Sequence, residues 1–259
     1  MLLIIPILLI ANCRTWATCR GQYYNTVTHL GAPLKAFWCM NETGTPGVMA
    51  DASGNNQNGK YGAPANVTLG VGSLVNDGTG NTAVSFDGSG SYLATVQNSA
   101  AIALTNFTLV FWYKSAGTVA NYALPVSMDG EATSSPGWEL QRDSGELTGY
   151  LRVDTSTSTN NVTPTSDFPK VFDGTRHMIA IGYTNTNNTT FISIDGAPYK
   201  TAIYINLAAP VVALYFGRGS VTAKLSGGVY QDAAIFSGQL SEPNLATLYK
   251  AGTVPAIHR

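Results

Sequence analysis

The sequence has 259 residues, of which 44% are hydrophobic and 11% are charged, and its formal net charge is −1 at neutral pH. This length fits one large β domain or two smaller domains, and it suffices to bury a core without a metal or a disulfide. The low charged fraction, with Gly, Thr, Ser and Asn in place of charged residues, disfavours a helical protein. The lack of a Lys/Arg run disfavours a nucleic-acid partner, because phosphates demand a basic patch.

The first eleven residues, Met1–Ala11, form the most apolar run of the chain. A bilayer span needs about twenty such residues, and an export signal needs a basic start and an A-x-A site, so we expect neither. Exposed apolar side chains are costly in water, so we expect this run to dock onto a neighbouring subunit. The residues of this assembly arm are Leu2, Leu3, Ile4, Ile5, Ile7, Leu8, Leu9 and Ile10.

The three cysteines, Cys13, Cys19 and Cys39, all lie near the amino end. An odd number cannot pair fully within one chain, and no CxxC spacing suggests zinc. The alternatives are small buried side chains without a role, a Cys13–Cys19 or a Cys19–Cys39 disulfide, or a bridge to another subunit.

Strand-like runs dominate the rest of the chain. Gly21–Pro33 is amphipathic, with one or two helical turns expected, and it leads into Leu34–Trp38; Asn41–Gly80 is a long polar segment rich in turn residues. Short runs then recur between Gly, Asn and Asp, which indicates a sandwich or jelly roll. The expected strands are Thr82–Asp87, Tyr92–Val96, Phe107–Lys114, Tyr122–Met128, Gly137–Arg142, Thr148–Val153, His177–Tyr183, Thr190–Asp195, Val211–Gly217 and Gly228–Phe236.

Two segments depart from this pattern. Asp154–Ser166 is too polar to pack, so we expect an exposed loop. Near the carboxyl end we expect a helix, because Ser241 can cap it and Glu242 suits its dipole. Its apolar face would hold Leu245, Leu248 and Tyr249, and Gly252 would end it.

Five segments, in the correct order, resemble a laminin-G-like, concanavalin-A-like domain. They are Asp51–Gly59, Ala83–Leu93, Phe107–Lys114, Asp173–His177 with Ile194–Gly196, and Gly228–Phe236 with the closing helix. The resemblance implies an all-β, two-sheet antiparallel jelly-roll sandwich with an extended amino-terminal arm and one short closing helix. We expect a docking arm at 1–35, the jelly roll at 36–252 and a tail at 253–259.

The residues at the amino-terminal start of the domain resemble those of similar domains in bacteriophage virion proteins. The residues concerned are Tyr23–Asn25, Pro33–Trp38 and Asn41–Thr43. Proteins of this kind serve as capsid decorations, fibres or tail-associated proteins.

A calcium site is one hypothesis for the Asp51–Gly59 turn. Calcium prefers carboxylate, amide and carbonyl oxygens, and Asp51 and Asn55 offer them. In related domains a carboxylate of the closing strand completes the shell, and Asp232 is the matching residue, although Gln231 replaces a second acid. The alternative is that Asp51 and Asn55 only brace their own turn. We expect no other cofactor.

An enzyme is not expected, because no strand carries the closely spaced carboxylates that retaining glycosidases need. Glu139, for example, has Gln141 as its neighbour on the same face. Glycan binding would use aromatic platforms, for which Tyr150, Tyr183, Trp138 and Tyr122 are candidates, although strand aromatics more often pack in a core.

These patterns favour a non-enzymatic virion protein of a tailed phage, anchored to other virion subunits by its arm and exposing a lectin-like domain to host-surface glycans. We expect a homo-oligomer, with a trimer as the first hypothesis. The alternative is a secreted or surface-anchored bacterial carbohydrate-binding module.

Overall fold

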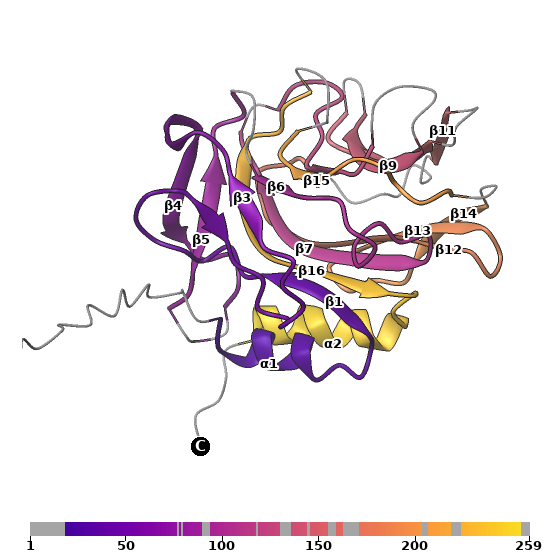
Figure 1. The fold of residues 1–259 in the computed structure, drawn as a ribbon, viewed down its shortest axis with the longest axis horizontal. Coiled ribbons are helices and arrows are strands. Elements are labelled where there is room, and N and C mark those ends of the chain that lie inside the picture. Colours follow the sequence, from indigo (N-terminus) through magenta and orange to yellow (C-terminus); the bar gives the residue numbers. More distant parts are fainter. Residues whose placement is uncertain are drawn as a thin grey trace, which may run out of the picture.

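The computed structural model describes residues 19–254 apart from 77, 79, 90–93, 118, 130–135, 144–145, 155–158, 163–170, 204–206 and 219–223, and only the backbone of 159–162. Within these residues the chain forms two antiparallel sheets of eight strands each, with two α-helices (Figure 1). The expected all-β jelly-roll sandwich is confirmed. Neither helix has the length and hydropathy that crossing a membrane requires.

The first sheet, sheet A, lies next to the helices, and strand β1 pairs with β16 beside its main path. In spatial order its strands are β14 (Lys200–Ile203), β13 (Thr189–Ile194), β12 (Arg176–Thr184), β7 (Phe107–Ser115), β16 (Gly228–Ser237), β5 (Thr82–Phe86) and β4 (Val67–Gly72), with β1 (Leu34–Trp38) added on β16.

The second sheet, sheet B, packs on the opposite side of the core. In spatial order its strands are β11 (Thr159–Val162), β10 (Gly149–Asp154), β9 (Gly137–Arg142), β8 (Val126–Ser127), β15 (Leu214–Phe216), β6 (Ala94–Val96), β3 (Gly59–Tyr61) and β2 (Val48–Met49). A short 3-10 turn, η1 (Pro64–Asn66), precedes β4.

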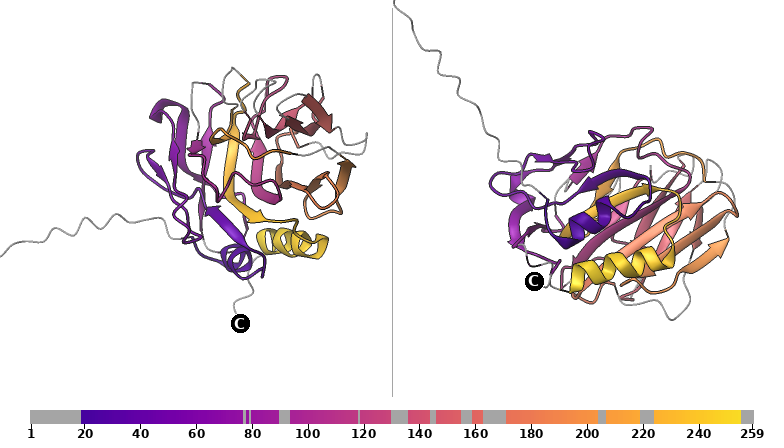
Figure 2. Two further views of the ribbon diagram at one scale, coloured as in Figure 1. Left: turned by 45° about the vertical axis from the view of Figure 1, so that its right-hand side comes forward. Right: turned by 90° about the horizontal axis from the view of Figure 1, so that it is seen from below.

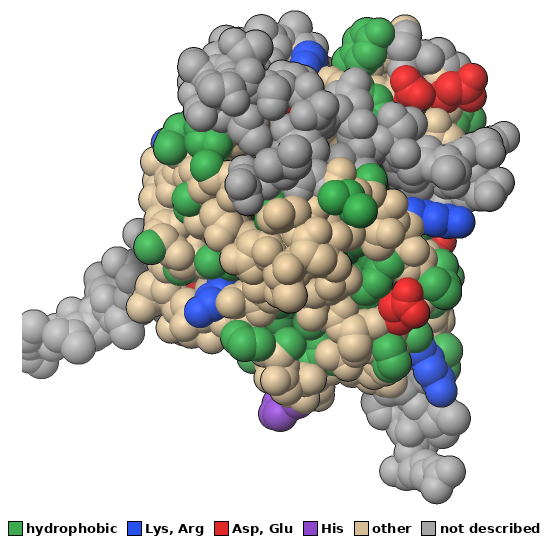
Figure 3. Space-filling view, turned by 90° about the vertical axis from the view of Figure 1, so that its right-hand side faces the viewer, with side chains coloured by type: hydrophobic (Ala, Val, Ile, Leu, Met, Phe, Trp, Pro, Cys, Tyr) green, Lys and Arg blue, Asp and Glu red, His purple; other side chains and the backbone are tan. Residues whose placement is uncertain are grey.

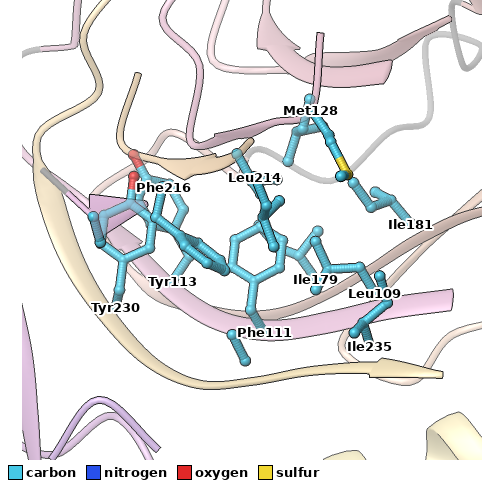
Figure 4. Close-up of a cluster of buried hydrophobic side chains, with 14 of the residues drawn as sticks. Leu109, Phe111, Tyr113, Met128, Ile179, Ile181, Leu214, Phe216, Tyr230 and Ile235 are labelled. Atoms are coloured by element: carbon cyan, nitrogen blue, oxygen red, sulfur yellow. The ribbon is translucent and has the colours of Figure 1, made fainter. Parts of the chain in front are cut away.

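The core between the sheets follows from the alternation of side chains along each strand. On β7, Leu109, Phe111 and Tyr113 point toward sheet B, where they meet Leu214 and Phe216 of β15 (Figure 4). The other face of β7 is apolar too, as expected for a central strand covered on both sides.

The outer face of sheet A is covered by the helices α1 (Gln22–Thr28) and α2 (Glu242–Thr253), as the view from below shows (Figure 2). Trp112 of β7 packs there against Tyr23 of α1 and stacks on Tyr249 of α2. Ser241 caps α2 by accepting a hydrogen bond from the amide of Asn244 at 3.3 Å. The amino-terminal segment therefore joins the body of the sandwich from α1 onward.

Two expectations about local structure are wrong. The helix ends at Thr253, one residue beyond Gly252. Gly252 instead serves packing, because it lies against the ring of Trp112, where a Cβ atom would collide. The segment Asp154–Ser166 is not only a loop, since Thr159–Val162 forms β11 and pairs with β10. Asp154 itself is fully buried at the end of β10.

The surface agrees with the composition. On the face in Figure 3, uncharged side chains prevail and the Lys, Arg, Asp and Glu side chains are scattered. Among the described residues visible on this side, uncharged side chains therefore dominate the surface.

Candidate functional site

The polar turn between β2 and β3 is organised by one carboxylate. Asp51 Oδ1 accepts hydrogen bonds from the backbone amides of Phe37 and Ser53, both at 2.9 Å. Asp51 Oδ2 accepts from the Ser53 hydroxyl at 2.9 Å and from the Gln57 amide at 2.8 Å. Both carboxylate oxygens are thus used to shape the turn and to tie it to β1.

The rest of the turn is held by contacts with both sheets. The indole of Trp38 donates to the carbonyl of Gln57 at 2.7 Å, and the hydroxyl of Ser99 donates to the Gln57 side chain at 2.6 Å. The amide group of Asn55 donates to the carbonyls of Leu34 and Lys35 at 3.1 Å. The turn is therefore pre-organised before any ligand arrives.

A pocket of about 380 Å³ opens beside this turn. Its volume is at the lower end of the range of small-molecule sites. The lining combines amides, carboxylates, one aromatic ring and a disulfide, contributed by Cys19, Tyr24, Cys39, Asn41, Glu42, Ala50, Asp51, Ala52, Asn56 and Asn58. We call it the amide pocket, after Asn41, Asn56 and Asn58.

These three amide groups keep hydrogen-bonding capacity for a ligand. Asn58 uses its Oδ1 to accept from the backbone amide of Asp51 at 2.8 Å, which leaves its NH₂ group as a donor. The side chains of Asn41 and Asn56 make no hydrogen bond to any other described residue. Asn56 lies in the left-handed region, with φ at 58°, a conformation that Asn tolerates better than most residues.

The second carboxylate of the pocket, Glu42, is also held in place. Its Oε1 accepts from the backbone amide of Ala50 at 2.8 Å, and its Oε2 accepts from the hydroxyl of Tyr61 at 2.6 Å. Burial raises the pKa of Tyr61 well above its usual range, and the nearby charge of Glu42 raises it further, so the phenol remains a donor. Two fixed carboxylates therefore give this wall a negative character.

Part of the pocket lining is a disulfide between Cys19 and Cys39, whose Cα atoms are 5.9 Å apart. It joins the segment before α1 to the end of β1. Cys13 and the apolar assembly arm lie outside the described residues, so the docking role of the arm stays a prediction.

The calcium hypothesis also stays a prediction, although the geometry matches its alternative. Asp51 and Asn55 are engaged in bracing the turn, as described above. Asp232 is buried at a bulge of β16, where its amide donates to the carbonyl of Cys39 at 3.2 Å. Among the residues that the structure describes, no group of three His, Cys, Asp or Glu side chains is placed to hold a metal.

A buried charge network on the outer face of sheet B could not be inferred from single strands. Arg152 of β10 lies opposite Glu139 of β9 in register. Its guanidinium lies 3.0 Å from Glu139 Oε1 and 2.7 Å from Asp154 Oδ2. The only sequence signal was the alternation of polar residues along both strands, which becomes meaningful once the hairpin register is known.

The structure distinguishes the four aromatic candidates by exposure. Trp138, Tyr150 and Tyr183 are buried, and only Tyr122 is exposed, with 45% of its surface accessible. Tyr122 does not lie on a strand as expected, because β8 is limited to Val126–Ser127.

The fold is shared with solved domains of very different sequence. No protein-family model matches the chain, and no curated protein sequence matches it significantly. The structure is similar to domain 4 of AbnA, an extracellular arabinanase from Geobacillus stearothermophilus, in complex with arabinotriose, with 14% identity, a TM-score of 0.59, and 84% of this chain and 98% of that one covered.

Two longer proteins show the same likeness. The binding domain of Paraclostridial Mosquitocidal Protein 1 has 15% identity and a TM-score of 0.59, over 84% of this chain and 52% of that one. Trypanosoma rangeli sialidase in complex with sialic acid has 13% identity and a TM-score of 0.56, over 88% of this chain and 36% of that one. The chain thus spans about half of the toxin domain and about a third of the sialidase. At these identities the likeness shows the β-sandwich fold.

Proposed function

We propose that this jelly-roll domain binds a neutral carbohydrate in the amide pocket. The observation that carries the proposal is the set of amide groups of Asn41, Asn56 and Asn58, which retain free donors and acceptors in a pre-organised pocket. Sugar hydroxyls are bound by such amides, and a neighbouring aromatic ring offers an apolar surface to the sugar. Tyr24 supplies that ring, stacked on Phe37 with centroids 5.9 Å apart.

A neutral ligand is favoured over an acidic one by the charges of the wall. Asp51 and Glu42 are both directed into protein hydrogen bonds and lie in the pocket lining. A sialic acid carboxylate would be repelled by them, since like charges in a partly desolvated site are costly. The arabinotriose of the similar arabinanase domain is the kind of uncharged ligand that fits this chemistry.

We also propose that the domain binds without catalysis. In the pocket, both oxygens of Asp51 and both oxygens of Glu42 accept hydrogen bonds from the protein itself. A retaining glycosidase needs one carboxylate as a nucleophile and another as an acid. Neither pocket carboxylate is free to take these roles.

The test is titration calorimetry of the full chain with arabinotriose, lactose, cellotriose and sialyllactose. We expect heat with at least one neutral sugar and none with sialyllactose. Asn56→Ala and Asn58→Ala should weaken binding, whereas Asn76→Ala, an exposed asparagine outside the pocket, should leave it unchanged. Binding that survives both pocket substitutions would contradict the assignment of the pocket.

The biological role of this sugar binding is a more specific proposal. We favour a virion structural protein of a tailed phage that contacts host-surface glycans and docks through Met1–Ala11, and this is supported by the apolar run and the uncharged surface. The alternative is a secreted or surface-anchored bacterial carbohydrate-binding module.

Intact mass of the mature chain separates the two settings, because the module requires removal of the first residues. Deletion of residues 1–11 should leave a folded domain that no longer assembles. A deletion variant that still enters particles would contradict the docking role.

A further inference from the structure

The turn before β8 presents an aromatic ring to solvent on a strained backbone. Tyr122 has φ at 61°, in the left-handed region, where a bulky side chain is unfavourable. Among the described Tyr, Phe and Trp side chains, Tyr122 is the only exposed one, with 45% of its surface accessible. Such an outlier needs a reason beyond packing, because the ring belongs to neither hydrophobic cluster.

Hydrogen bonds on both sides hold this conformation. Arg142 Nη1 donates to the carbonyl of Val119 at 2.7 Å and to Asn121 Oδ1 at 2.9 Å. The amide of Arg142 donates to the carbonyl of Ala123 at 2.9 Å, and the amide of Ala123 donates to the carbonyl of Ala120 at 3.2 Å. These contacts use the flanking residues, so they would hold the turn equally well with glycine at position 122.

Polar side chains contact the backbone at Tyr122. The side-chain amide of Gln141 reaches the carbonyl of Tyr122 at 3.5 Å, and the hydroxyl of Tyr150 donates to the same Gln141. The hydroxyl of Tyr122 makes no hydrogen bond to any other described residue. An exposed aromatic ring of this kind can cover the apolar face of a sugar, and polar groups of the same turn can meet the sugar hydroxyls.

We propose that Tyr122 is the stacking platform of a second carbohydrate contact, separate from the amide pocket. The ring covers the C–H face of one neutral sugar unit, and polar groups of the same turn meet the sugar hydroxyls. This contact rests on the proposed carbohydrate function. It lies on the turn that leads into β8, whereas the amide pocket lies at the end of β1.

The experiment is a titration of the full chain with arabinotriose and lactose, followed by nuclear magnetic resonance of the side-chain amides. Asn121 and Gln141 report on the platform, and Asn56 and Asn58 report on the amide pocket. We expect sugar-dependent shifts at both places in the wild-type chain.

Substitutions at position 122 separate a binding role from a structural role. Tyr122→Gly removes the ring and relieves the left-handed strain, so the melting temperature should hold or rise while platform affinity falls roughly tenfold. Tyr122→Phe should retain the shifts at the platform. Tyr215→Ala, which removes a half-buried ring of β15 beneath Arg218, is the matched control and should leave the platform shifts intact.

Each outcome decides between the proposals. Platform shifts that persist in Tyr122→Gly, or shifts confined to the pocket in the wild-type chain, overturn the second contact and leave the pocket standing. Shifts at neither place, with any of the sugars, overturn the second contact together with the proposed function.

Discussion

The carboxylate of Asp51 accepts a hydrogen bond from the backbone amide of Phe37 at 2.9 Å, which ties the polar turn to strand β1. This contact spans two sheets of the sandwich, because β1 belongs to sheet A and the turn joins two strands of sheet B. Asp51 is therefore one of the residues that connect the wall of the amide pocket to sheet A, together with Asn55 and Trp38.

Replacement of Asp51 by Ala should destabilise the fold by about 3 kcal/mol, because several amides lose a charged acceptor. Urea unfolding followed by tryptophan fluorescence measures the change. Asp87→Ala is the control, because Asp87 is exposed and its carboxylate accepts hydrogen bonds from Ser89 in its own turn and from Asn66 of η1, away from β1. Equal losses in the two variants would show that the link to β1 contributes nothing.

Removal of the guanidinium of Arg152 should cost about 3–5 kcal/mol, because Glu139 and Asp154 are fully buried and would lose the cation that both of them contact. Arg152→Lys should recover part of the loss, since it keeps the charge but not the planar fork. Lys224→Ala should cost much less, because its ammonium is 3.9 Å from Glu139 and partly exposed. Thermal unfolding of the three variants provides the ranking, and an Arg152→Ala chain as stable as wild type would contradict it.

Opening the Cys19–Cys39 disulfide should destabilise the fold by about 3 kcal/mol, the chain-entropy cost for a loop of this size. Cys19→Ser, Cys39→Ser and the double variant should be equally destabilised, because each removes the same bond. Sugar affinity should fall with them, since both cysteines line the amide pocket. A double variant clearly less stable than either single one would show that the cysteines act separately.

Stability should decrease as the pH rises past neutrality, because of His177. Burial alone would lower the pKa of His177, but its hydrogen bond to Asp195 and the charges of Asp195 and Asp173 outweigh burial and raise that pKa above 6.5. His177 Nδ1 lies 2.8 Å from Asp195 Oδ2, and Nε2 lies 3.4 Å from Asp173 Oδ1. A raised folded-state pKa gives stability that is complete below the unfolded pKa and is lost as the pH rises through the folded one.

Urea unfolding at about pH 5.5 and about pH 8 measures this effect, and His177→Gln should flatten the difference. The contribution of Asp173 to stability changes in the acid pH range instead. Burial would raise its pKa, but hydrogen bonds from the backbone and side chain of Thr175 and the charge of His177 lower it, so its contribution is lost as the pH falls into the acid range. A His177→Gln chain with an unchanged pH profile would contradict the role of His177.

The sequence was sufficient for the elements whose signals are local. The apolar residues on both faces of Phe107–Lys114 predicted a central strand, and Ser241 with Glu242 predicted the start of α2, because side-chain periodicity and capping act within a few residues. The same logic failed at Asn41–Gly80, where β2 and β3 have only two and three residues and glycines interrupt β4. It also failed at Thr159–Val162, where pairing with β10 makes the strand.

The candidate sites could be identified only from contacts between residues that are distant in the sequence. Asp51 and Asn55 were identifiable as turn residues, yet the free amides of Asn41, Asn56 and Asn58 are visible only when every other donor and acceptor has been paired. Likewise, Arg152 meets Glu139 through hairpin register, and Tyr122 alone remains exposed among the aromatic candidates. Local propensity determines which segments become strands, whereas which polar groups stay unpaired and which rings reach solvent depends on the packing of the whole sandwich.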